Sequence, residues 1–338
     1  MNSDALTLRT YPVYPRILLI CGVALAMLLG GTMPASANPV IWKLSWPETD
    51  FSKTSVAFDE IMSGGPPKDG IPSIDAPKFV PQAEYSGAAE TEPVITFEHK
   101  GDARAYPLRV LIWHEIVNDT VGGLPVAVTY CPLCNSSIVF DRRVDGRVLD
   151  FGTTGKLRKS DMVMYDRQSE SWWQQFTGTG IVGGMTGREL KMLPARVEAL
   201  AAFRARFPDG KVLVPNDPDF RPYGSNPYQG YDSAPRPFLY RGDLPEGIAP
   251  LAYVVKVGDQ AWPLETLRQA GKIVAGDITL TWTAGQNSAL DVQEIAKGRD
   301  IGNVVVQRRT ADGLREEIHD VTFAFVFHAF VDGGTIHK

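Results

Sequence analysis

The sequence has few cysteines, 3 among 338 residues. Cys21 lies in an N-terminal apolar run that we expect to be removed, which leaves Cys131 and Cys134 in the mature chain. Two cysteines are too few to hold so long a chain together, so a disulfide-rich scaffold is excluded. The pair is expected to act at one local site.

The chain also lacks a basic excess, because 34 Lys and Arg stand against 39 Asp and Glu for a formal net charge of -5. This balance offers no electrostatic footprint for nucleic acid or an anionic membrane, and neither is expected as a partner. A small molecule, a glycan or another protein remains as the class of partner.

Several catalytic signatures are absent. The sequence contains no Gly-rich phosphate loop, no serine nucleophile elbow and no HExxH metal motif. Asn135 rather than histidine follows the CPLC motif at 131–134, which excludes covalent c-type haem on that motif.

The N-terminus has the pattern of a secretory signal. Arg9 and Arg16 precede an apolar run at 17–29, and small residues at 35–37 offer a cleavage site. We expect cleavage after Ala37, a periplasmic or secreted protein, and no membrane span after processing. The alternative is an uncleaved anchor, which the run disfavours because a spanning helix needs about 20 apolar residues.

The strongest local pattern surrounds the two cysteines. An alternating strand at 126–130 runs into CPLC, and a second strand-like run follows at 137–140, which predicts a hairpin with a thiol pair at its tip. Pro132 fixes φ, and Asn135 tolerates the left-handed conformation that a tight turn needs. Tyr130 ends the incoming strand.

The rest of the chain predicts a mainly β fold, because 32 Gly and 25 Pro favour many short strands. One helix is expected near 195–207, where apolar residues recur with helical spacing. Adjacent Trp172 and Trp173 are expected to divide between core and surface. Residues 215–250 predict a long loop, either a plain surface loop or one whose aromatic side chains wall a cleft.

An internal sequence repeat predicts two related β subdomains. Residues 253–264 (YVVKVGDQAWPL) repeat the pattern of 96–108 (TFEHKGDARAYPL), and 278–288 (ITLTWTAGQNS) repeat 126–136 without the cysteines. The expected domains are a signal at 1–37, an N-terminal wrap at 38–91, a first subdomain at 92–250 and a degenerate second one at 251–338. The cysteines are then dispensable for the hairpin fold.

The motifs GDARAYPL, WHEIVND, TYCPLCNSSIVFDR and SDMVMYDRQSESWWQQFTG resemble a family of exported bacterial and archaeal proteins, domain-of-unknown-function family 3179. The resemblance implies a shared fold over roughly 66–330 and a shared site near His114, Glu115, Tyr130 and Cys131. It implies no activity.

Three hypotheses remain for the thiols. The first is a transition-metal site for Cu, Zn or Fe, with Cys131 and Cys134 as thiolate ligands and His114 as the leading third ligand. His328 is the next candidate for the third ligand, and His99 and His319 come after it. The second is a thiol–disulfide oxidoreductase, which the strand after Cys134 disfavours because redox pairs usually begin a helix.

The third hypothesis is a glycan- or protein-binding module in which the pair forms a local disulfide. Beside the hairpin, a further polar cluster is expected from Asp161, Asp166 and Arg167. An Asp-Arg pair of this kind is more often a structural salt bridge than part of a catalytic site.

Overall fold

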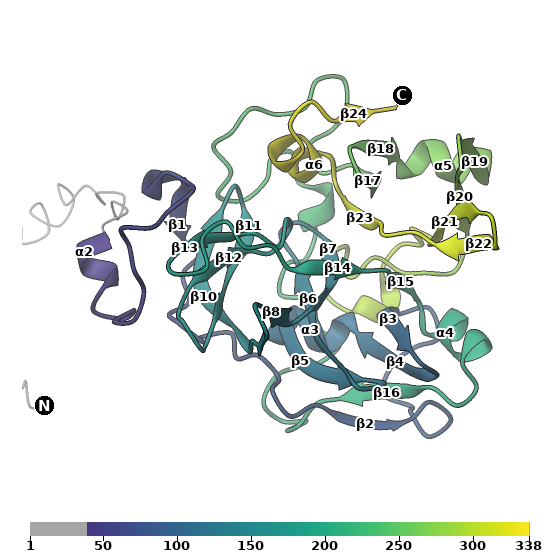
Figure 1. Cartoon of the computed structure of the whole chain (residues 1–338). Coiled ribbons are helices and arrows are strands. Elements are labelled where there is room, and N and C mark those ends of the chain that lie inside the picture. Colours follow the sequence, from purple (N-terminus) through teal and green to yellow (C-terminus); the bar gives the residue numbers. More distant parts are fainter. Residues whose placement is uncertain (1–38, 338) are drawn as a thin grey trace, which may run out of the picture. The chain divides into compact units, whose positions relative to one another are not determined.

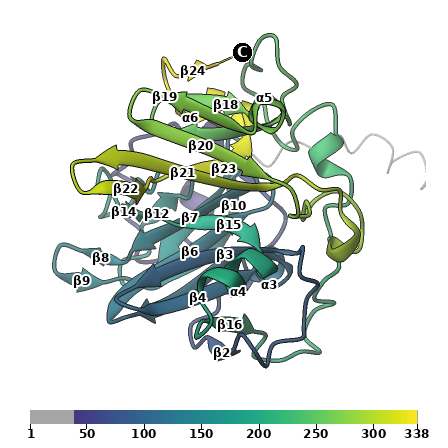
Figure 2. The same cartoon turned by 90° about the vertical axis from the view of Figure 1, so that its right-hand side faces the viewer.

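The computed structural model describes residues 39–337, and the chain in this range is mainly β, as predicted. Helices are short, and four of those described have seven residues each. Five sheets of four or five strands and one two-stranded ribbon make up the strand content. Figures 1 and 2 show their arrangement from two sides.

The first half of the chain builds three sheets. One has the order β15 (Arg196–Ala199), β3 (Pro93–His99), β4 (Asp102–Pro107), β16 (Lys211–Val214) and β2 (Lys78–Pro81). The sheet that carries the cysteines has the order β14 (Lys191–Leu193), β7 (Ser136–Asp141), β6 (Leu124–Cys131) and β5 (Ile116–Val121). The third has the order β1 (Ile61–Ser63), β10 (Phe151–Arg158), β11 (Asp161–Asp166), β12 (Trp172–Gln174) and β13 (Gly180–Val182).

The second half builds two sheets. One has the order β23 (Asp320–Phe323), β17 (Tyr253–Val257), β18 (Gln260–Pro263) and β24 (Thr335–Ile336), and the other β19 (Lys272–Ala275), β20 (Ile278–Thr283), β21 (Asn303–Thr310) and β22 (Gly313–Glu316). The ribbon pairs β8 (Arg143–Val144) with β9 (Arg147–Val148). The helices are α2 (Pro39–Trp42), α3 (Leu108–His114), α4 (Leu200–Arg206), α5 (Leu264–Ala270), α6 (Ala324–Phe330) and the 3-10 turns Phe58–Glu60, Tyr231–Ser233 and Ile295–Lys297.

The two halves share an order of elements. In each, an antiparallel hairpin (β3–β4, β17–β18) leads at once into a seven-residue helix (α3, α5) and then into a second hairpin (β5–β6, β19–β20). An edge strand (β15, β23) pairs antiparallel with the first strand and continues into a helix (α4, α6), and a last strand (β16, β24) joins parallel. The shared pairing is what the structure shows; an inherited duplication stays a prediction.

The helix content differs from expectation in two places. The segment after Pro107 forms helix α3, which the sequence did not predict; Pro107 is its N-cap residue and has the extended backbone (φ −61°, ψ 130°) usual at that position. The helix expected over 195–207 begins only at Leu200, because 196–199 pair with β3 as strand β15. The short helix predicted near 195–207 is confirmed as α4, and α2, α3, α5 and α6 are further short helices that were not predicted.

The two adjacent tryptophans do not divide between core and surface. Trp172 and Trp173 are both fully buried. Trp173 packs in the main core with its ring 5.9 Å from that of Phe151, whereas Trp172 lies against Trp46 at 5.3 Å and Phe51 at 5.4 Å. They face opposite sides, as a strand requires, but the N-terminal wrap covers the second side.

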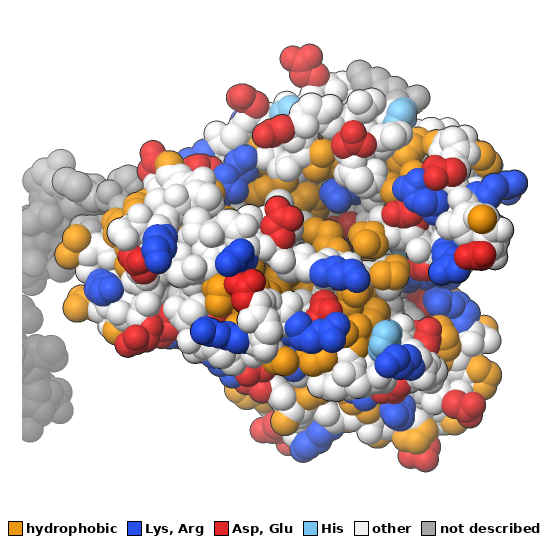
Figure 3. Space-filling model, viewed as in Figure 1, with side chains coloured by type: hydrophobic (Ala, Val, Ile, Leu, Met, Phe, Trp, Pro, Cys, Tyr) orange, Lys and Arg blue, Asp and Glu red, His pale blue; other side chains and the backbone are white. Residues whose placement is uncertain are grey.

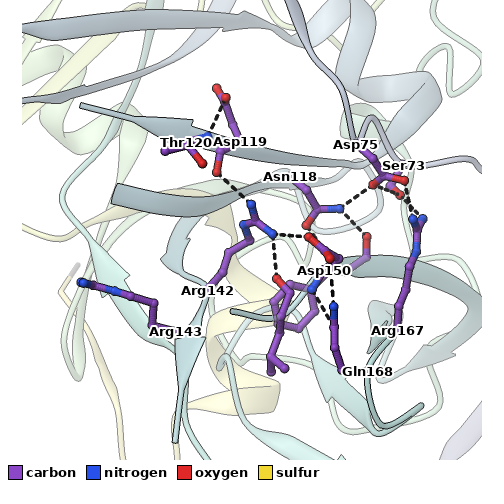
Figure 4. Close-up of polar contacts among 12 residues, drawn as sticks. Ser73, Asp75, Asn118, Asp119, Thr120, Arg142, Arg143, Asp150, Arg167 and Gln168 are labelled. Carbon is purple, nitrogen blue, oxygen red and sulfur yellow. Dashed lines mark hydrogen bonds and ion pairs between the residues drawn. The ribbon is translucent and has the colours of Figure 1, made fainter. Parts of the chain in front are cut away.

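A polar network fastens the segment before β3 to β5 and β10 (Figure 4). Asn118 on β5 donates to Asp75 (2.7 Å) and to the Phe151 carbonyl (2.8 Å), and accepts from the Phe151 N–H (2.9 Å). Arg167 pairs with Asp75 from the other side. Because buried Asn118 needs these partners, and exposed Arg167 also pairs with Asp75, the Pro- and Gly-rich segment at 66–81 is held in an ordered path.

Candidate metal centre

The two cysteines lie at the tip of the β6–β7 hairpin, where the sequence places them. Cys131 pairs with Ser136 as the last register pair, and the Cys134 N–H donates to the Cys131 carbonyl at 3.2 Å. Asn135 has φ 46°, which confirms the left-handed residue predicted for this turn. Both cysteines are buried and free. The turn thus presents two thiols to the interior.

Strand β23 of the second half holds this turn from the opposite side. The Thr322 hydroxyl donates to the Cys134 carbonyl at 2.7 Å, and the Asn135 side-chain amide donates to the Val321 carbonyl at 2.8 Å. Asp320 accepts from the Ser136 hydroxyl (2.6 Å) and the Ser137 N–H (3.0 Å). The turn is fixed by contacts that lie far apart in sequence.

A second tight turn brings a carboxylate to the thiols. Lys159 (φ 52°) and Ser160 (φ 68°) connect β10 to β11 in the conformation of a type I′ hairpin turn, which places Asp161 at the start of β11. Ligand atoms of Cys131, Cys134 and Asp161 all lie within 4.8 Å of one another. Asp161 Oδ2 accepts from Gln174 (2.6 Å) and the Phe176 N–H (2.9 Å), but the buried Oδ1 has no hydrogen-bond partner among residues 39–337.

Burial dominates the electrostatics of this cluster. It raises the pKa of the Cys131 and Cys134 thiols, the latter well above its usual range, and raises the pKa of Asp161 to about 6. Glu115, at the end of α3, has its pKa raised to about 8 by burial and by the charge of Asp161. No Lys, Arg or His within residues 39–337 forms an ion pair with either carboxylate. Four acidic groups therefore share a region that lacks a cation.

The structure does not bring His114 into the cluster. Its Nδ1 lies 2.7 Å from the Pro72 carbonyl and its Nε2 lies 2.7 Å from the Tyr223 hydroxyl. Its ring stacks on Tyr223 with centroids 5.8 Å apart, and burial lowers its pKa. Both nitrogens are engaged, so metal binding by His114 through either nitrogen would require that nitrogen to give up its present contact. The residue that joins the thiols is Asp161.

Some of the other predicted site residues lie at the cysteine turn, and the rest lie away from it. Tyr130 is buried next to the turn, and its hydroxyl donates to Asn135 at 3.3 Å. Asp166 lies at the far end of β11, where it accepts from Ser169 and from the Trp173 indole at 2.9 Å. His328 is exposed on α6. Arg167 belongs to the structural network of Asp75, so the polar cluster predicted from 161–167 contributes only Asp161.

An aromatic pocket of about 460 Å³ overlies the cysteine turn. Leu133 of the turn lines it together with Tyr228, Tyr231 and Phe238 from the 215–250 segment. The Tyr231 hydroxyl donates to the Leu133 carbonyl at 3.1 Å. The sequence offered a cleft walled by aromatic side chains as one of two interpretations of this segment, but it did not identify which residues would line it.

Charges of both signs are mixed over the surface that Figure 3 shows, with no area of a single sign. Among residues 39–337, no helix has the length and apolar character needed to cross a membrane.

Fold and site together define a mainly β protein of two similarly built halves, the first of which carries a buried Cys–Cys–Asp cluster. The chain belongs to the family described as Protein of unknown function (DUF3179), whose model matches residues 68–334. This agrees with the resemblance in its motifs. Comparison with curated proteins and with solved structures gave no match.

Proposed function

We propose that this protein binds a divalent transition metal of the zinc class through Cys131, Cys134 and Asp161. The observation that carries the proposal is the approach of two thiols and one buried carboxylate within 4.8 Å of one another. Two sulfur ligands of one tetrahedral zinc lie roughly 3.8 Å apart, given Zn–S bonds of about 2.3 Å. Small side-chain adjustments would close the set around one ion.

Electrostatics supports the same proposal. Ionising two thiols and a carboxylate in a buried region without a cation is unfavourable, which is why the pKa of each is raised in the metal-free chain. A divalent ion supplies the missing positive charge and releases protons as it binds. Mixed sulfur and oxygen ligands suit zinc, whereas Cu(I) selects softer sets.

The redox alternative receives less support. A reactive cysteine needs a lowered pKa and access to its partner, but burial raises the pKa of both thiols. Strand β7, not a helix, begins directly after the turn, so the cysteines do not stand at the start of a helix in sequence as a usual redox pair does. A binding module with a local disulfide would use the aromatic pocket over Leu133, and it predicts a metal-free protein.

Metal analysis of anaerobically prepared protein tests the proposal. We expect about one zinc equivalent in the wild type and its loss in Cys131→Ser and in Asp161→Asn, because each removes one ligand. Asp166→Asn is the matched control, since Asp166 is an equally buried carboxylate on the same strand that is bound by Ser169 and Trp173. Metal-free wild type, or equal metal in all variants, would contradict the proposal.

A further inference from the structure

Glu115 is a buried acid beside the cluster that the three ligands leave unused. Its side chain is 8% exposed. Its backbone is well bonded, since its N–H donates to the Leu111 carbonyl at 2.7 Å and its carbonyl accepts from the Tyr130 N–H at 2.8 Å. The carboxylate, in contrast, has no hydrogen bond or ion pair among residues 39–337. No residue among 39–337 therefore has to release this carboxylate before it can bind a ligand.

The surroundings of this carboxylate are those of the thiol cluster. The charges of Glu115 and Asp161 act on one another, and the charge of Glu115 acts on Cys131 and on the Tyr228 hydroxyl that lines the aromatic pocket. The Glu115 backbone is also bonded to Tyr130, the residue directly before Cys131. The carboxylate therefore lies near enough to Asp161 and Cys131 for their charges to interact.

The backbone at Glu115 has a conformation that favours glycine. Glu115 ends α3 with φ 57° and ψ −31°, and the equivalent residue after α5 in the second half is Gly271, with φ 67° and ψ −32°. A residue with a side chain is strained at this position, whereas glycine is not. The half with the cysteines carries glutamate where the half without them carries glycine. This contrast indicates that the side chain has a role in the cysteine half.

We propose that Glu115 supplies the fourth donor to a divalent cation held by Cys131, Cys134 and Asp161. The inference rests on the proposed function and deepens it. The Glu115 oxygens lie outside the group joined within 4.8 Å, so the side chain must rotate toward the cation. It breaks no hydrogen bond in doing so, whereas His114 would break one.

The donor set has a consequence for selectivity. Two thiolates and two carboxylates around a divalent ion give the same formal charge as a four-cysteine zinc site, which proteins use widely. Oxygen donors disfavour Cu(I), which prefers sulfur. Glu115 should therefore favour zinc over Cu(I). Removing its charge should reduce the ratio of the zinc affinity to the Cu(I) affinity.

Titration of chelator-treated protein with Co²⁺, followed by competition with Zn²⁺, tests this role. We expect Glu115→Gln to raise the Kd for Co²⁺ by about tenfold or more, the range found when a group that tunes a metal site is lost. The ligand-field absorption bands should shift, while the thiolate-to-cobalt charge-transfer bands persist. Glu98→Gln, which removes an exposed carboxylate, is the matched control and should bind as the wild type does.

Glu115→Gly provides a second variant that keeps the fold, since it installs the residue that the second half uses and relieves the positive φ. It should lose affinity as Glu115→Gln does. If both variants bind Co²⁺ with wild-type affinity and spectra, Glu115 is not a donor, although the Cys–Cys–Asp site stands. If the wild type itself binds neither Co²⁺ nor Zn²⁺, both proposals fail.

Discussion

At the scale of single residues, the buried carboxyl of Glu115 makes the stability of the metal-free protein depend on pH. Its pKa is about 8 in the folded chain against an ordinary value of 4.5, so the folded state holds a proton that the unfolded state releases between these values. Stability from this group is complete below pH 4.5 and is lost as the pH rises through 8. The slope reaches about 1.4 kcal/mol per pH unit at most.

Denaturant unfolding of chelator-treated protein at pH 6, 7 and 8 measures this slope. Asp161 and Asp320 each have a pKa of about 6, so they contribute with the same sign mainly below this window. His114 and His319, whose pKa values burial lowers, contribute with the opposite sign up to about pH 6.5. We therefore expect the free energy of unfolding to fall more steeply with pH in the wild type than in Glu115→Gln, because the two proteins share every titrating group except this one. Equal slopes in the two proteins would contradict the assignment.

The sequence predicts some of these residues well because their roles are local. The left-handed turn at Asn135 and the adjacency of Cys131 and Cys134 follow from six consecutive residues. Asp161 reaches the thiols only because a turn about 25 residues after Cys134 directs it toward them. The sequence therefore predicts Asp161 near the hairpin but does not identify it as the third ligand. His114 was favoured by residue type, but its contacts to Pro72 and Tyr223 depend on the tertiary fold.

At the scale of elements, the cysteine turn depends on a strand from the other half. The Thr322 hydroxyl on β23 is buried and donates to the Cys134 carbonyl at 2.7 Å, which also accepts from the Phe323 N–H at 3.2 Å. Thr322→Val keeps the shape of the side chain but removes its hydroxyl donor. We expect it to lower the free energy of unfolding by about 1 to 2 kcal/mol, because a buried hydrogen bond is lost.

Thr281→Val is the control for this substitution. Thr281 lies within β20, is half-buried, and its hydroxyl has no hydrogen-bond partner among residues 39–337. Its replacement should change the free energy of unfolding by no more than about 0.5 kcal/mol, as is usual away from specific contacts. Equal effects at both positions, measured by urea unfolding, would show that β23 does not hold the turn.

Short elements explain where sequence reasoning failed. Helices α3 to α6 have only seven residues each, about two turns, which is too short for a helical period to stand out from the strand alternation around them. In 195–207, pairing with β3 overrides helix propensity over 196–199. The strand-rich character was predictable because it arises from many residues at once.

At the scale of the whole molecule, the two halves exchange contacts in a reciprocal way. Strand β23 of the second half contacts β7, and β15 of the first half contacts β21. The first contact fixes the cysteine turn, and in the second the Ala199 N–H donates to Asn303 at 2.7 Å. The internal repeat in the sequence predicted two similar halves. It did not predict their mutual packing, because this packing joins residues over 100 positions apart.

The predicted N-terminal signal bears on the compartment in which the thiols would work. Residues 1–37, where the signal is predicted, lie outside the described residues, which begin at Pro39 with Trp42 and Trp46 already packed on Trp172. Cleavage after Ala37 would keep this packing and deliver the protein to an oxidising compartment, where a bound metal protects thiolates from oxidation. Mass spectrometry of the exported protein should find Asn38 as the first residue; an intact Met1 in the membrane fraction would instead indicate a retained anchor.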